Sequence, residues 1–273
     1  MKLLFATILT LICAKASYSQ QSASSYNFAS STSIEYNKAF IKKNFDDRYY
    51  WMAYQQVYEY YSSRKDTAAL LDISYLLLRR PGNYIPWRKS GGPFRTPTQL
   101  DKAYNRAAET VSMVYQARSK YDSALYYLYR TDTVYAYFGD CGNDINMHAI
   151  DYACRYADLY LKLGDQKSAV NALLKQSLND EHNKHIKKLQ SLLATYNRTE
   201  LKTKLKTKLK AAIASYKPSA FKYDGGNYYI IFLGVRAPFY FWNENSEAGK
   251  VDPPASVIAH LEQTPFYKMV MAL

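Results

Sequence analysis

The sequence predicts a mainly α-helical protein that carries a small β-ribbon and further helices at its C-terminal end. In residues 34–216, apolar and aromatic side chains recur at intervals of three and four, and the prolines are confined to residues 79–97, a pattern typical of amphipathic helices. After residue 217, a turn cluster precedes two β-branched and aromatic runs, which predicts paired strands. We therefore expect four segments: a signal peptide at 1–19, a flexible Ser-rich leader at 20–33, a helical repeat domain at 34–217, and a β-ribbon with helices at 218–273.

The first 19 residues have the three parts of a secretory signal peptide. Lys2 supplies a positive start, an apolar run covers residues 3–14, and small residues follow. The apolar run is shorter than the ~20 residues of a membrane-spanning helix. The stretch "SYSQQ" resembles the cleavage region of exported Bacteroidetes proteins, and cleavage after Ala16 or after Ser19 fits the small residues there. We expect an exported protein, periplasmic or secreted.

The helical region divides into segments at its turn signals. Predicted helices cover 47–62, 66–79, 98–118, 122–138, 145–163, 165–178, 181–196 and 199–216, interrupted by the Pro/Gly-rich stretch 79–97 and by "GDCGND" at 139–144. The triplets "DTA" at 66, "DSA" at 122 and "DTV" at 132 suit helix N-caps, where a short acidic side chain accepts backbone N–H groups. They also resemble the O-glycosylation motif of exported Bacteroidetes proteins, but we expect caps.

The lysine-rich segment 199–217 is predicted to be a helix that packs on one side only. Leu201, Leu205 and Leu209 recur every fourth residue and form an apolar stripe, while the lysines border it. The basic residues of 184–210 fit an anionic glycan, a membrane surface or a solvated helix face. Base-stacking aromatic residues are scarce there and the chain is expected to be exported, so no nucleic-acid partner is expected.

The C-terminal region is predicted to hold strands near 228–233 and 238–242, followed by two helices. Asp252 before two prolines is a capping acid with proline at the first helical position. The final stretch 264–273 reads as an apolar helix. We expect Met269, Val270 and Met271 to dock on the body of the protein.

Three helix pairs resemble one another, at "YEYYSSRKDTAALLDI", "VYQARSKYDSALYYL" and "LYLKLGDQKSAVNALL". Each has a tyrosine, a short turn and a small residue in the second helix, aligned at Ala68, Ala124 and Ala169. The pattern resembles the tetratricopeptide repeat, a helix-turn-helix unit of ~34 residues, best in the third pair. The spacings here are 56 and 45 residues, and the third pair lacks the repeat's tryptophan and terminal proline. The resemblance implies an irregular α-solenoid with a concave groove.

The sequence predicts no catalytic, cofactor-binding or metal site. It contains no GxSxG, phosphate-binding glycine loop, CxxC pair or dinucleotide fingerprint. His182 and His185 are three residues apart, whereas zinc ligands on one helix are usually four apart. Cys141 and Cys154 suit either one disulfide or two unpaired core residues.

These observations favour a non-enzymatic binding or scaffold protein for a protein, peptide or acidic envelope partner. The chain carries 36 basic and 23 acidic residues and 29 tyrosines, so the groove is expected to be basic and Tyr-rich, with Tyr115 and Tyr160 as candidate positions. Tyrosine also serves packing and sugar stacking.

Two alternatives stay open. SusD-like glycan-binding proteins have similar helices and aromatic residues, but this chain is shorter and lacks their anchoring cysteine. In a glycan-binding protein, Trp87, Trp242 and the tyrosines would be the exposed aromatic platforms. An enzyme of unknown class would use Asp140, Asp144 and His148.

Overall fold

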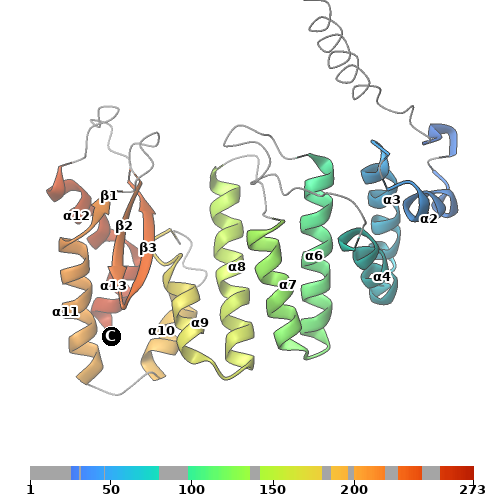
Figure 1. The fold of residues 1–273 in the computed structure, drawn as a ribbon. Helices are drawn as coiled ribbons and strands as arrows, with labels where there is room; N and C mark the ends of the chain where they lie inside the picture. Colours follow the sequence, from blue (N-terminus) through green and yellow to red (C-terminus); the bar gives the residue numbers. More distant parts are fainter. Residues whose placement is uncertain are drawn as a thin grey trace, which may run out of the picture.

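The computed structural model describes residues 26–30, 32–45, 47–79, 98–135, 142–179, 186–195, 200–218, 227–241 and 253–273. In these ranges the protein is mainly helical and has one small three-stranded antiparallel sheet. The helices stand in a row that follows the chain, and the sheet lies at the C-terminal end of the row (Figure 1). The predicted signal peptide lies outside the described residues. So do six residues singled out in the sequence: Trp87, Asp140, Cys141, His182, His185 and Trp242.

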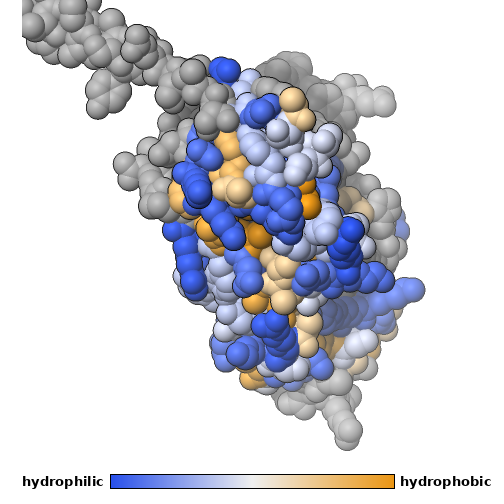
Figure 2. Space-filling model, turned by 90° about the vertical axis from the view of Figure 1, so that its right-hand side faces the viewer, coloured by the Kyte–Doolittle hydropathy of each residue, from blue (hydrophilic) through white to orange (hydrophobic). Residues whose placement is uncertain are grey.

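The N-terminal end of the row consists of the short 3-10 helix η1 (Phe28–Ser30), α2 (Ile34–Lys43), α3 (Tyr50–Ser63) and α4 (Thr67–Leu78). The leader was expected to be flexible, but Tyr26 is only 5% exposed, and its hydroxyl donates to Asn37 Oδ1 at 3.1 Å. Its ring meets Phe40 edge-on. One aromatic side chain with a buried partner therefore orders the part of the leader that the structure describes. Figure 2 faces this end of the row, where hydrophilic side chains interrupt the apolar ones.

The middle of the row consists of α6 (Gln99–Ala117), α7 (Tyr121–Thr133), α8 (Gly142–Lys162) and α9 (Gln166–Leu174). Thr98 and Asp101 form a capping box at the start of α6, in which each side chain accepts the backbone N–H of the other. α7 ends at Thr133, five residues earlier than predicted. Asn105 explains part of this end, because its side-chain amide donates to the carbonyls of Thr131 and Tyr135 at 3.2 and 2.6 Å.

The three predicted helix pairs share one turn geometry. Lys65, Ser119 and Gly164 each have a positive φ, of 54°, 56° and 78°. The N–H of the next residue donates to the carbonyl of a tyrosine five positions earlier, in the pairs Asp66–Tyr61, Lys120–Tyr115 and Asp165–Tyr160, at 2.8–3.0 Å. This is the hydrogen bond of a Schellman helix end. The carbonyl of the tyrosine that recurs in the sequence therefore accepts the hydrogen bond that closes the first helix of each pair.

The turns correct the alignment of the first pair. Counted from the left-handed residue, Ala124 and Ala169 stand at the fifth position, and both are fully buried. The fifth position of the first pair is Leu70, which is buried, whereas Ala68 is exposed. The predicted equivalence of Ala68 is wrong by two residues. The backbone turn sets which residues of the second helix face the first. An alignment that matches alanines by sequence alone can therefore pair residues at different distances from the turn.

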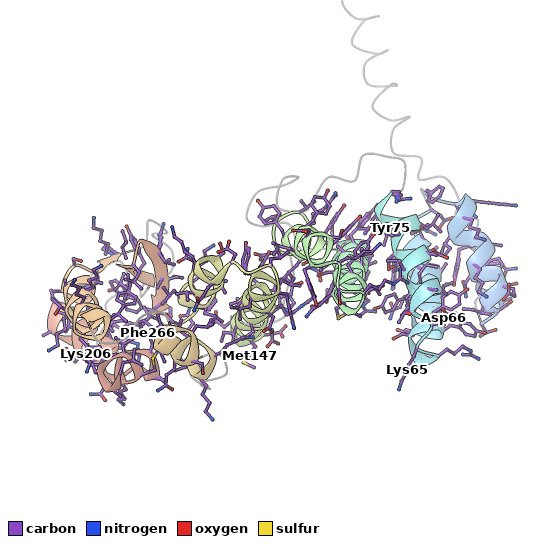
Figure 3. The ribbon with its side chains drawn as sticks, turned by 90° about the horizontal axis from the view of Figure 1, so that it is seen from below. Lys65, Asp66, Tyr75, Met147, Lys206 and Phe266 are labelled. Atoms are coloured by element: carbon purple, nitrogen blue, oxygen red, sulfur yellow. The ribbon has the colours of Figure 1, made fainter. Side chains whose placement is uncertain are left out.

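The C-terminal part begins with α10 (Ile186–Thr195) and α11 (Glu200–Ala214). The prediction of a helix in the lysine-rich segment is confirmed: Leu205 and Leu209 are buried, whereas Lys204 and Lys208 are exposed. Lys206 of this helix lies at the end of the molecule opposite Lys65 (Figure 3).

The sheet contains β1 (Lys217–Pro218), β2 (Asn227–Phe232) and β3 (Val235–Tyr240), in that order. The predicted ribbon is therefore confirmed, with a third short strand. α12 (Pro254–Gln263) and α13 (Pro265–Ala272) follow. α12 starts one residue later than expected, with Pro253 as N-cap and Pro254 at the first helical position. On α13, Met269 and Val270 are buried and Met271 packs against the same core, as predicted.

The C-terminal region is not a separate appendage. One buried cluster joins Leu173 of α9, Leu209 of α11, Ile230 of β2 and Phe266 of α13, and Phe266 points into it (Figure 3). The expected boundary at residue 217 therefore runs through a shared core. The reason is the apolar inner face of the hairpin, which needs the helices to cover it.

Among the residues that the structure describes, no helix combines the length and apolar character that crossing a bilayer requires. Cys154 on α8 is half-buried and packs against the C-terminal cluster. Its predicted partner Cys141 lies outside the described residues, so the disulfide stays a prediction.

Candidate functional site

A groove of about 540 Å³ lies where α7, α8 and α9 meet the turn between β2 and β3. Its floor and walls carry aromatic, polar and small side chains. The lining residues are Tyr129, Asp132, Ala149, Tyr152, Ala153, Tyr156, Tyr160, Ser168, Asn171, Ala172, Lys175, Gln176, Gly234, Val235 and Arg236. The alanines and Gly234 leave room between the larger groups.

α8 contributes a row of three tyrosines to the groove. Tyr152, Tyr156 and Tyr160 are four residues apart, so they project from one face of the helix. The rings of Tyr156 and Tyr160 are nearly parallel, with centroids 6.4 Å apart. Tyr152 is 4% exposed, while the other two are half-buried. We call these three residues the tyrosine row.

The hydroxyls of Tyr152 and Tyr156 stay protonated at neutral pH. Burial raises the pKa of Tyr152 to about 12. Burial raises the pKa of Tyr156 further, and the carboxylate of Asp132 adds to this shift; the Tyr156 hydroxyl donates to Asp132 Oδ2 at 3.5 Å. A phenol that keeps its proton can donate a hydrogen bond to a ligand, so the row offers flat apolar rings with polar tips.

The opposite wall is polar and basic. Ser168 and Asn171 of α9 and its C-cap residue Lys175 stand three and four residues apart along one face. Strand β3 adds Arg236, whose guanidinium lies over the ring of Tyr229, 3.9 Å from its centroid. The groove thus has one acid, Asp132, on the α7 side, and two cations on the α9 and β3 side. The expectation of a Tyr-rich, basic groove fits these lining residues.

The two candidate tyrosines have different positions. Tyr160 lines the groove. Tyr115 instead packs between helices: its hydroxyl is 2.5 Å from that of Tyr75, and its ring stacks on Tyr127. Figure 3 shows Tyr75 toward the N-terminal end of the row, away from the groove. Tyrosine as packing between helices, the broader expectation, is confirmed for Tyr115.

Of the residues proposed for an enzymatic site, Asp144 and His148 do not line the groove, and Asp140 lies outside the described residues. Asp144 stands in the first turn of α8, and the ring of His148 contacts that of Tyr152 at a tilt of 48°, with ring centroids 4.1 Å apart. Burial lowers the pKa of His148, although nearby Glu109 and Asp151 oppose the shift. Across the described part of the chain, no three His, Cys, Asp or Glu side chains are placed to hold a metal ion.

The sequence reasoning missed Asp132, Lys175 and Arg236. Asp132 was interpreted as a helix cap, which is wrong because it stands in the last turn of α7. Asp122 is in the first turn of α7 and is not its N-cap, whereas Asp66 does cap α4 by accepting from Ala69 N at 3.0 Å. The spacing of four between Tyr152, Tyr156 and Tyr160 was the available signal. The hairpin's position could not be read from spacing.

Comparison with known proteins gives no relative. No protein-family model, curated protein or solved structure matches the chain.

Proposed function

We propose that the protein is an exported, non-enzymatic binding protein that holds an extended peptide segment of a partner protein in the groove. The tyrosine row carries this proposal, because the stacked, half-buried rings of Tyr156 and Tyr160 stand side by side along one wall of the groove, with buried Tyr152 beside them. Aromatic side chains supply large contact area at a small cost in side-chain entropy, and they dominate the energetics of many interfaces. The opposite wall adds hydrogen-bonding groups and positive charge.

The helical-repeat architecture is part of the same proposal. Three helix pairs, each with the same left-handed turn between its two helices, support an irregular array related to the tetratricopeptide repeat. In such arrays, neighbouring pairs build an extended surface for partner chains. The lining residues include neither histidine nor cysteine, and their rings, amides and hydroxyls suit binding.

Glycan capture is the second candidate function. Val235 is the only large aliphatic side chain among the lining residues, and the amides of Asn171 and Gln176 face the same groove as the tyrosine row. Sugar rings stack on aromatic faces and exchange hydrogen bonds with amides, so this composition also suits an oligosaccharide.

Selection from a displayed library of random 12-residue peptides against the chain from residue 20 tests the leading proposal. We expect enriched peptides whose affinity falls on the order of tenfold in Tyr156→Ala, since removal of a central aromatic anchor typically costs at least about 1–2 kcal/mol. Tyr126→Ala is the matched control, because Tyr126 is 54% exposed and does not line the groove.

A glycan array with the same variants decides between the two candidates. Saturable glycan binding that requires Tyr156, without any peptide binding, would replace the peptide by a glycan.

A further inference from the structure

The turn between β2 and β3 fixes which backbone groups of β3 face its partner strand. Leu233 and Gly234 both have positive φ, of 51° and 78°, and Phe232 pairs with Val235. These are the marks of a two-residue type I′ hairpin. In that turn, the N–H of the fourth residue bonds to the carbonyl of the first, so the N–H of Val235 faces β2.

Pairs in an antiparallel ladder alternate between hydrogen-bonded and non-hydrogen-bonded. Val235 and Ala237 therefore direct their backbone groups toward β2, whereas Arg236 and Pro238 direct theirs to the other side. Pro238 fits this assignment, because a residue without an N–H is tolerated where no ladder bond is needed. In the sheet that the structure describes, that other side is the outer edge, since the strand order is β1-β2-β3.

Arg236 lines the groove together with Gly234 and Val235. The outward N–H and carbonyl of one edge residue thus stand at the wall that faces the tyrosine row. Pro238, two residues further along β3, cannot donate a hydrogen bond, so the edge offers a complete donor–acceptor pair at Arg236 and not at the next outward position. A strand laid on this edge would pair at Arg236, beside the groove.

We propose that the partner segment binds as an extended strand whose backbone pairs with the N–H and carbonyl of Arg236. This inference rests on the proposed function and specifies its binding mode. The segment crosses the tyrosine row and carries an acidic residue near Arg236, where Lys175 and the Arg236 guanidinium supply positive charge. A peptide has alternating N–H and carbonyl groups that match a strand edge, whereas a glycan does not.

Backbone N-methylation of the best selected 12-residue peptide tests this mode. Each nitrogen is methylated in turn, and each result is compared with alanine at the same position. We expect one nitrogen, or two in alternating positions, at which N-methylation weakens binding at least tenfold more than alanine does. If no nitrogen shows this excess, strand pairing is wrong, while groove binding still stands on the Tyr156→Ala result.

Two variants of Arg236 give a second readout on the protein. Arg236→Ala removes the side chain and keeps the N–H, whereas Arg236→Pro removes both. Because this N–H faces away from β2, the proline variant is expected to fold, as checked by its circular dichroism and melting temperature. We expect Arg236→Pro to bind at least fivefold more weakly than Arg236→Ala. Equal binding by the two folded variants overturns the inference; if Arg236→Pro does not fold, the assignment of its N–H to the outer edge is itself wrong.

A selection that yields no peptide contradicts the proposed function and this binding mode together.

Discussion

At the scale of single residues, buried polar side chains hold helix ends in place. Asn105 is 7% exposed, and its amide serves the carbonyls of Thr131 and Tyr135 at the end of α7. We expect Asn105→Ala to lower the free energy of unfolding by about 1–3 kcal/mol, because two buried acceptors lose their donor. Urea titration followed by circular dichroism measures the change. Asn171→Ala, on the half-buried groove wall, is the matched control, and an equal loss in both variants would contradict the role of Asn105.

The tyrosines also find their main explanation at this scale. Tyr26, Tyr50, Tyr54, Tyr104, Tyr135, Tyr152 and Tyr228 are all buried, so packing accounts for a large share of an unusual composition. Few tyrosine rings remain to line the groove. Composition alone therefore gave no means of separating the tyrosines proposed to bind a partner from those that pack between helices.

At the scale of elements, the shared turn of the three helix pairs predicts opposite effects of glycine and alanine. A left-handed φ costs an ordinary residue about 1–2 kcal/mol, whereas glycine adopts it freely. Gly164→Ala should therefore destabilise the protein by about 1 kcal/mol, since no atom lies near the added Cβ and only the backbone conformation is penalised. Lys65→Gly should stabilise it by about 0.5–1 kcal/mol. Thermal unfolding of both variants checks the pair of signs.

The control for this prediction is a glycine placed outside the left-handed position. Asp66→Gly removes the side chain that caps α4 and should lower stability slightly. If Lys65→Gly and Asp66→Gly change the melting temperature in the same direction, the left-handed turn is not what limits stability at this site.

At the scale of the whole molecule, the shared C-terminal core predicts that residues 218–273 cannot be removed without damage. Their removal takes Ile230, Phe239, Leu261 and Phe266 from the cluster that covers α9 and α11, and each such side chain contributes about 1.5–3 kcal/mol when buried. We expect a chain ending at residue 217 to lose its cooperative urea transition in this region and to bind the dye ANS. An unchanged midpoint would show that the helical region folds independently.

Much of the fold could be predicted from the sequence because local patterns report local structure. The period of Leu205 and Leu209 gave the lysine-rich helix, and the aromatic runs near 228 and 238 gave the hairpin. The tyrosine that precedes each turn marked the three helix pairs. The predictions were wrong where a position in three dimensions was inferred from spacing in the sequence. These cases are the alignment of Ala68, the role of Asp132 and the placement of Tyr115.

By itself, the sequence determined most of the helices and the β-hairpin, though not β1 or the bounds of α2, because hydrophobic period and turn residues act over a few positions. It also determined that the groove-bearing protein would be basic and rich in tyrosine. Only the tertiary structure decided that the hairpin shares a core with α9 and α11, and that Asp132, Lys175 and Arg236 meet the tyrosine row. These residues come from α7, α9 and β3, and their meeting depends on how the apolar faces of those elements bury one another, which no local pattern encodes.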